Sequence, residues 1–93
     1  MEKVKLQAQY GLYINGEWRN ASDGATYNAE SPADGSHLAV CAQGTREDVE
    51  AASAAAWEAF KTWKKTTPAQ RAALLNKIAD IIDANKEHLA MVE

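Results

Sequence analysis

The sequence predicts an α+β fold, with short β-strands first and helices after them. The first half holds brief aromatic and β-branched runs separated by Asn-Gly, Asp-Gly and Pro-containing turns. The second half holds two long stretches with apolar residues three and four positions apart. Strands followed by helices, rather than alternating with them, are typical of α+β architecture. We expect a polar lead-in at residues 1–9, strands at about 10–42, helices at about 46–63 and 68–84, and a short helix at about 86–93.

The first expected element is a β-hairpin centred on Asn15-Gly16. Both positions of its tight turn need positive φ, which Asn and Gly adopt readily. Tyr13-Ile14 is expected to pair with Glu17-Trp18 across the turn. The first strand is expected to start at Tyr10. Alternation along the two strands places three apolar residues at candidate buried positions: Leu12, Ile14 and Trp18.

Two further strands are expected before the helices. A weaker candidate covers residues 25–30, and a stronger one covers residues 36–42, with Leu38 and Val40 on one face. The turn between them, residues 31–35, has proline early to fix φ and glycine late to relieve it.

The first long helix has a reciprocal start signal, because Thr45 is followed three positions later by the carboxylate of Asp48. The apolar residues that share one face of this helix are Val49, Ala52, Ala56, Ala59, Phe60 and Trp63. Its many alanines allow another element to pack very close. We expect Trp63 to be buried between the two long helices.

The second long helix has the signature Thr67-Pro68 at its start, with Gln70 completing a capping box. Its apolar stripe comprises Leu74, Leu75, Ile78, Ile81 and Ile82. Asn85 is expected to end this helix and to cap the short third one. That last helix has no stop signal before Glu93, which favours a chain that continues.

Composition sets further bounds. Ninety-three residues allow one domain. The net charge of −3 gives no electrostatic reason to expect a nucleic acid or a membrane as partner. Cys41 is the single cysteine, which rules out an internal disulfide and fits a cytoplasmic protein.

Candidate chemical groups are few, and each has a plainer interpretation. Cys41 is a possible nucleophile, but a small strand residue with no activating partner is the favoured interpretation. His37 and His88 are far apart in sequence and are expected at the surface. Three tryptophans could form a stacking surface, but core packing is the simpler interpretation: Trp18, Trp57 and Trp63. Three lysines could bind phosphate, but a solvated helix end is the simpler interpretation: Lys61, Lys64 and Lys65. We assign no catalytic, cofactor-binding or metal-binding residue, because glycines are isolated at turns and no metal-ligand pattern is present.

Together these motifs resemble the N-terminal segment of the aldehyde dehydrogenase superfamily. The matching stretches, in family order, are residues 13–18, 31–35, 47–63, 71–80 and 89–93. Ser31 stands where the family's Asn-Pro-Ala-x-Gly turn usually has asparagine. The sequences of the hairpin and of this turn most closely resemble those of the acetaldehyde-type bacterial members.

The resemblance implies that residues 10–93 form the N-terminal portion of an α/β coenzyme-binding domain in an oligomeric oxidoreductase. The implied reaction is NAD- or NADP-dependent oxidation of a small aldehyde to a carboxylic acid, through addition of a cysteine thiolate and hydride transfer. The family's nucleophile, base and coenzyme site all lie downstream of these motifs, so this fragment is expected to be inactive by itself. Its partner would be the remainder of the dehydrogenase chain. The alternative is a stand-alone α+β module that docks a protein partner through its alanine-rich helix.

Overall fold

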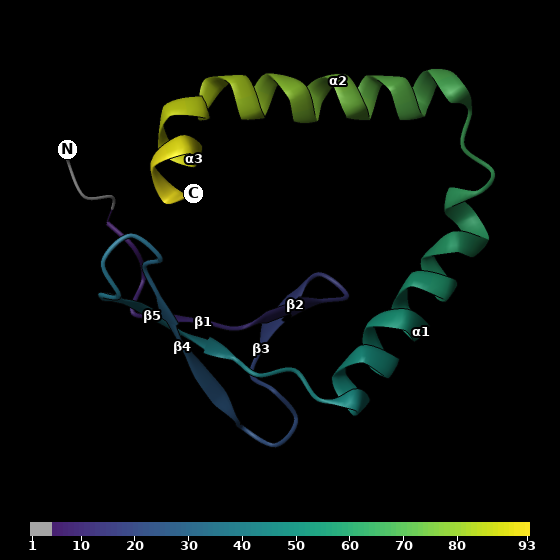
Figure 1. The fold of residues 1–93 in the computed structure, drawn as a ribbon. Coiled ribbons are helices and arrows are strands. Elements are labelled where there is room, and N and C mark those ends of the chain that lie inside the picture. Colours follow the sequence, from purple (N-terminus) through teal and green to yellow (C-terminus); the bar gives the residue numbers. More distant parts are fainter. Residues whose placement is uncertain (1–4) are drawn as a thin grey trace. The chain divides into compact units, whose positions relative to one another are not determined.

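The computed structural model describes residues 5–93 and confirms the α+β class, with short strands followed by helices along the chain (Figure 1). The residues group into two compact units, Leu6–Lys61 and Thr62–Glu93, and the boundary falls in the last turn of α1. The elements are β1 (Gln9–Tyr10), β2 (Leu12–Ile14), β3 (Glu17–Arg19), β4 (Thr26–Glu30), β5 (His37–Ala42), α1 (Arg46–Trp63), α2 (Pro68–Ala84) and α3 (Lys86–Val92).

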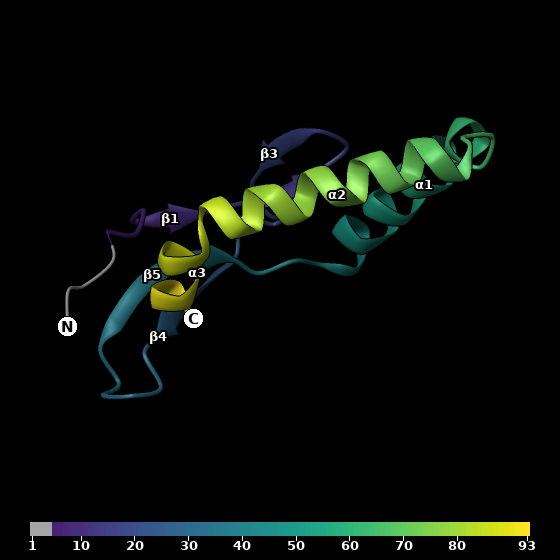
Figure 2. The ribbon, with the colours of Figure 1, turned by 90° about the horizontal axis from the view of Figure 1, so that it is seen from above.

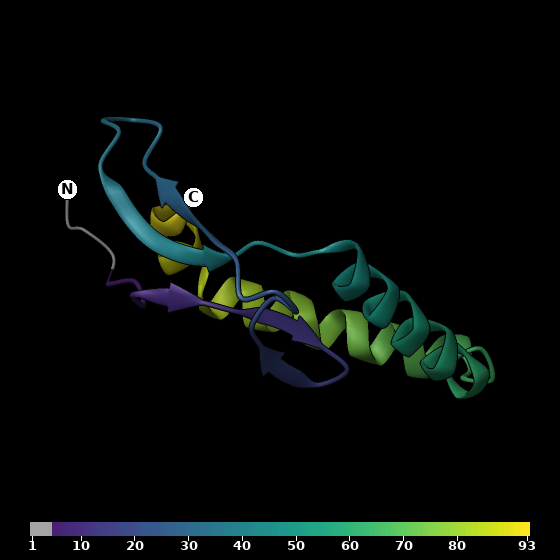
Figure 3. The same ribbon diagram turned by 90° about the horizontal axis from the view of Figure 1, so that it is seen from below.

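The larger sheet has the order β1-β5-β4, with β5 in the centre. β5 runs antiparallel to β4, from Thr26 opposite Ala42 to a bulge between Ala29 and Glu30. It also runs parallel to β1. Figure 3 shows β4 beside β5 and the loop that joins them. Ala39, at the middle of the central strand, is only 2% exposed and marks the small core of this sheet.

One predicted strand is in fact two. The run from Tyr10 to Ile14 divides at Gly11, so that β1 joins the larger sheet and β2 pairs with β3. A Cβ at Gly11 would lie 2.7 Å from the carbonyl oxygen of Arg19, which shows how closely the two backbones approach there. Gln9, expected in the lead-in, belongs to β1. Residues 1–4 of that lead-in lie outside the described part of the chain.

The β2–β3 hairpin confirms the turn prediction. Asn15 and Gly16 have φ of 53° and 78°, and Ile14 pairs with Glu17 and Tyr13 with Trp18. The expected burial of Trp18 is wrong, because its side chain is 68% exposed. Residues directly opposite each other on antiparallel strands share a face. Trp18 therefore packs edge to face against exposed Tyr13, with ring centroids 4.9 Å apart, while the half-buried Leu12 and Ile14 alternate onto the other side.

The start of α2 also agrees with prediction. The Thr67 hydroxyl accepts the N–H of Gln70 at 3.1 Å, and the Thr67 N–H donates to the Gln70 side-chain oxygen at 2.9 Å. At the other end, the Asn85 amide donates to the carbonyl of Ile81 at 2.8 Å and so closes α2. Asn85 also occupies the N-cap position of α3, as expected, although its side chain makes no capping hydrogen bond there. Figure 2 shows α3 as a short helix turned away from the axis of α2.

The expected burial of Trp63 is wrong as well, because its side chain is 46% exposed. Periodicity identifies which helix face is apolar, but tertiary contacts decide whether anything covers that face. The same holds for α2, in which no residue is buried. Within residues 5–93, no helix combines the length and the hydropathy that crossing a bilayer requires.

Candidate functional site

Asp48 is the most enclosed polar residue of the described chain, with 2% exposure, and it lies in the first turn of α1. One carboxylate oxygen accepts the backbone N–H of Ser22 at 3.1 Å and that of Thr45 at 2.9 Å. The other oxygen accepts a guanidinium N–H of Arg19 at 3.2 Å, which makes an ion pair. The carboxylate thus joins the end of β3, the turn after it and the start of α1.

Two hydroxyls complete this cluster. The Thr45 hydroxyl accepts the Asp48 backbone N–H at 3.2 Å and, with the Thr45 N–H bond to the carboxylate, confirms the expected reciprocal cap; the same hydroxyl donates to Asp48 Oδ2 at 3.0 Å. The Ser22 hydroxyl lies 2.7 Å from the Thr45 hydroxyl. Because Thr45 has already donated its only hydroxyl proton to Asp48, Ser22 is the donor in this contact.

These donors stabilise the ionised carboxylate. The Thr45 backbone N–H, and next that of Ser22, lower the pKa of Asp48 from 3.8 to about 2, with burial acting in the opposite direction. The Thr45 hydroxyl and Arg19 also lower it. A carboxylate with this pKa holds no proton to donate at neutral pH, and its low basicity, together with its existing hydrogen bonds, makes it a poor general base. Its role is to anchor the helix start.

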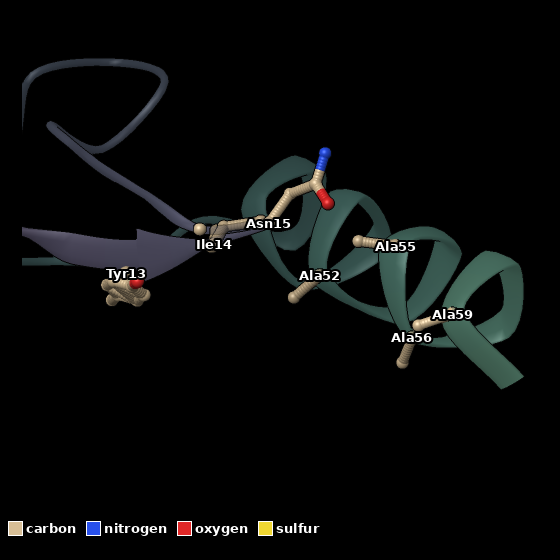
Figure 4. Close-up of a pocket in the computed structure, with 8 residues that line it drawn as sticks. Tyr13, Ile14, Asn15, Ala52, Ala55, Ala56 and Ala59 are labelled. Carbon is tan, nitrogen blue, oxygen red and sulfur yellow. The ribbon is translucent and has the colours of Figure 1, made fainter. Parts of the chain in front are cut away.

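An open groove of about 480 Å³ lies farther along the same unit, between the hairpin tip and α1. Ala52, Ala55, Ala56 and Ala59 line its helix side (Figure 4). The hairpin side consists of residues 13–16, and Figure 4 shows Ile14 and Asn15 beside the helix. Asp48, Ala52, Ala55 and Ala59 follow one another at four-, three- and four-residue steps, so anchor and groove occupy one helix face.

The structure places Cys41 in the central strand of the larger sheet. It is half-buried and stands opposite Tyr10 on one side and Tyr27 on the other. Neither neighbour in register is a base of the kind that activates a cysteine nucleophile at neutral pH. The interpretation of Cys41 as a small strand residue is the one that this position supports.

The other candidate groups are dispersed. His37 lies exposed at the start of β5 and His88 lies exposed in α3. Trp57 packs edge to face against Phe60 with centroids 5.9 Å apart, separately from the Tyr13–Trp18 pair. Lys61 makes an ion pair with Glu58 at 2.8 Å, which matches its charge locally. Among residues 5–93, no three histidine, cysteine or acidic side chains gather as metal ligands would.

The sequence identified only part of the Asp48 cluster. The Thr45–Asp48 signal is local and was visible as a cap. Arg19 and Ser22 are 29 and 26 residues from Asp48, and nothing in their own neighbourhoods marks them as its partners. Only the tertiary structure brings Arg19 and Ser22 within hydrogen-bond distance of Asp48.

Comparison with known proteins gives a consistent result. The profile of the aldehyde dehydrogenase family matches residues 18–93. A long-chain-aldehyde dehydrogenase from Acinetobacter sp is 38% identical over 91 residues, covering 98% of this chain and 18% of that protein. The NADP/NAD-dependent aldehyde dehydrogenase PuuC of Escherichia coli is 36% identical over 92 residues, covering 97% and 19%.

A solved structure agrees. A 3,6-anhydro-L-galactose dehydrogenase in complex with NAP superposes with a TM-score of 0.83 at 40% identity, covering 88% of this chain and 17% of that one. The chain therefore spans less than a fifth of the length of these three proteins.

Proposed function

This chain belongs to the aldehyde dehydrogenase family, and we propose that it is the N-terminal scaffold segment of an NAD(P)-dependent dehydrogenase that oxidises an aldehyde to a carboxylic acid. The observation that carries the proposal is the structural match, which extends over 88% of this chain at a TM-score of 0.83. The names of the E. coli and Acinetobacter relatives support aldehydes as the substrate class. The E. coli name also supports NAD or NADP as the coenzyme.

We propose that residues 5–93 do not by themselves form a site for that coenzyme. A pyrophosphate needs free backbone N–H groups at a helix start or a glycine-rich turn. The start of α1 is taken up by the Asp48 carboxylate and the Thr45 hydroxyl, and the start of α2 by the Thr67 side chain and by Pro68, which has no N–H. The glycines lie in separate turns and connections, with positive φ at Gly16, Gly24 and Gly35. The coenzyme would be held by other parts of the enzyme.

The segment's own contribution is structural. The Asp48 cluster fixes the start of α1 against the β3 end and the following turn, and so sets the direction in which the helix leaves the strands. We propose that the 93-residue chain alone neither oxidises aldehydes nor binds NAD(P). We further propose a cytoplasmic homo-oligomer as the complete enzyme, without nucleic acid or membrane partners, in keeping with the net charge of −3.

A chimera tests the proposal. The segment of the E. coli enzyme that matches this chain over 92 residues is replaced by this chain, and NADH or NADPH formation is followed by absorbance with a small aldehyde. We expect turnover by the chimera, the same turnover with Cys41→Ser, and none from the 93-residue chain alone. Turnover by the isolated chain that is lost in Cys41→Ser would make Cys41 the nucleophile and refute the scaffold role. A folded but inactive chimera would favour the stand-alone interaction module.

A further inference from the structure

α2 carries an aliphatic stripe that is open to solvent. Its five members are each between 45% and 67% exposed: Leu74, Leu75, Ile78, Ile81 and Ile82. Their spacing places them on one third of the helix circumference, whereas Asn76, Asp80 and Asp83 lie on the opposite side. We call these five residues the α2 stripe.

Such a stripe needs a cover. Most of the stability of a helix in a protein comes from packing its amphipathic face, since isolated helices of about this length are marginal in water. The ends of α2 are stabilised by the Thr67 capping box and by the Asn85 side-chain hydrogen bond. Neither of these local interactions buries apolar surface. Contiguous exposed apolar patches on soluble proteins mark interaction sites.

We infer that the α2 stripe is the surface that binds the remainder of an aldehyde dehydrogenase chain, and that it does so even when the two are separate polypeptides. This rests on the proposed function, and the occupant follows from the comparison of lengths. A similar fold occurs in a dehydrogenase in which the matching segment makes up 17% of the chain, so a protein of that kind has more than four fifths of its length available as cover. The stripe has no charged member, so the surface that meets it is apolar.

A longer partner also fits better than a second copy of this chain. Apolar side chains are exposed on α1 and α3 as well, including Val49, Trp57 and Leu89. A symmetric pair joined through the α2 stripe accounts for the five stripe residues only. A partner several times longer than this chain has enough surface to cover all of them.

Binding in trans tests the inference. The 93-residue chain is titrated by calorimetry into the E. coli enzyme PuuC lacking its matching segment. Leu75→Asp is the stripe variant, because Leu75 is 67% exposed and the helix itself does not depend on its burial. Asn76→Asp is the matched control, because it adds the same charge at the next position in the sequence, on the polar face of α2 opposite the stripe. Far-UV circular dichroism verifies that both variants keep their helix content.

We expect the wild-type chain and Asn76→Asp to bind alike, and Leu75→Asp to bind at least about tenfold more weakly, because an unpaired carboxylate is costly to bury. Equal binding of Leu75→Asp and wild type overturns the inference. So does a concentration-dependent dimer of the chain that Leu75→Asp abolishes, which assigns the stripe to a second copy. An active chimera together with no binding in trans refutes this inference while leaving the scaffold role intact.

Discussion

The two units of this chain are stabilised in different ways. Leu6–Lys61 is held together by contacts between residues far apart in sequence, such as the β1–β5 pairing and the ion pair of Arg19 with Asp48. In Thr62–Glu93, the side-chain hydrogen bonds that organise α2 join residues three or four positions apart. The first unit therefore encloses a charged group, whereas the second has none of its residues buried. Long-range contacts create an interior, and local ones create only helix.

The largest loss of stability is expected for Asp48→Ala, which tests whether long-range contacts hold the Leu6–Lys61 unit together. The change leaves the Arg19 guanidinium and the N–H groups of Ser22 and Thr45 without their shared acceptor in a partly buried site. We expect a larger loss of unfolding free energy than a helix-cap or surface substitution produces, seen as a lower midpoint in urea. An unchanged midpoint would show that the cluster does not hold the unit together.

The dependence of unfolding free energy on pH tests the same contribution of Asp48. The pKa of Asp48 is lowered from 3.8 to about 2 on folding, so its stabilisation is fully present above pH 3.8 and is lost as pH falls through about 2. We expect the difference in urea midpoint between wild type and Asp48→Asn to be constant near neutral pH and to shrink from about pH 4 to pH 2. A difference that stays constant over that interval would contradict the assigned direction of the shift.

A smaller effect is expected in the locally organised unit. Thr67→Ala removes the hydroxyl that accepts the Gln70 N–H and is expected to cost about 1 kcal/mol of α2 stability. Thr67→Ser keeps an acceptor at the same position and serves as the control. Thermal melts followed at 222 nm measure both. Loss of structure in the Leu6–Lys61 unit as well would show that the two units are coupled.

The smallest effect is expected for an exposed pair on α1. Arg46 and Glu50 are in contact at 3.3 Å, but their side chains are 93% and 65% exposed. Glu50→Ala is expected to cost no more than about 0.5 kcal/mol, and about 1 M salt should remove that difference through screening. A cost comparable to that of Asp48→Ala, two positions earlier, would mean that burial is not what separates the two carboxylates.

Gly11 shows why part of the fold escaped prediction. The run from Tyr10 to Ile14 has strand character throughout, and no local signal says that it serves two sheets. The division follows from the approach of Gly11 to the Arg19 carbonyl, and from the parallel pairing of Gln9 with Val40, 31 residues away. Trp18 was misplaced for a similar reason, since its exposure depends on which residue it faces across the hairpin.

The sequence by itself determined the features that are encoded within three or four residues. These are the positive φ of Asn15-Gly16, the Thr45–Asp48 and Thr67–Gln70 caps, the helices between and after them, and the family motifs. Tertiary structure alone decided the strand order β1-β5-β4, the burial of Ala39 and Asp48, and the exposure of Trp18 and Trp63. The physical reason is one of range. Backbone propensities and caps act within a turn of chain, whereas burial and ion pairing depend on which distant segment arrives alongside.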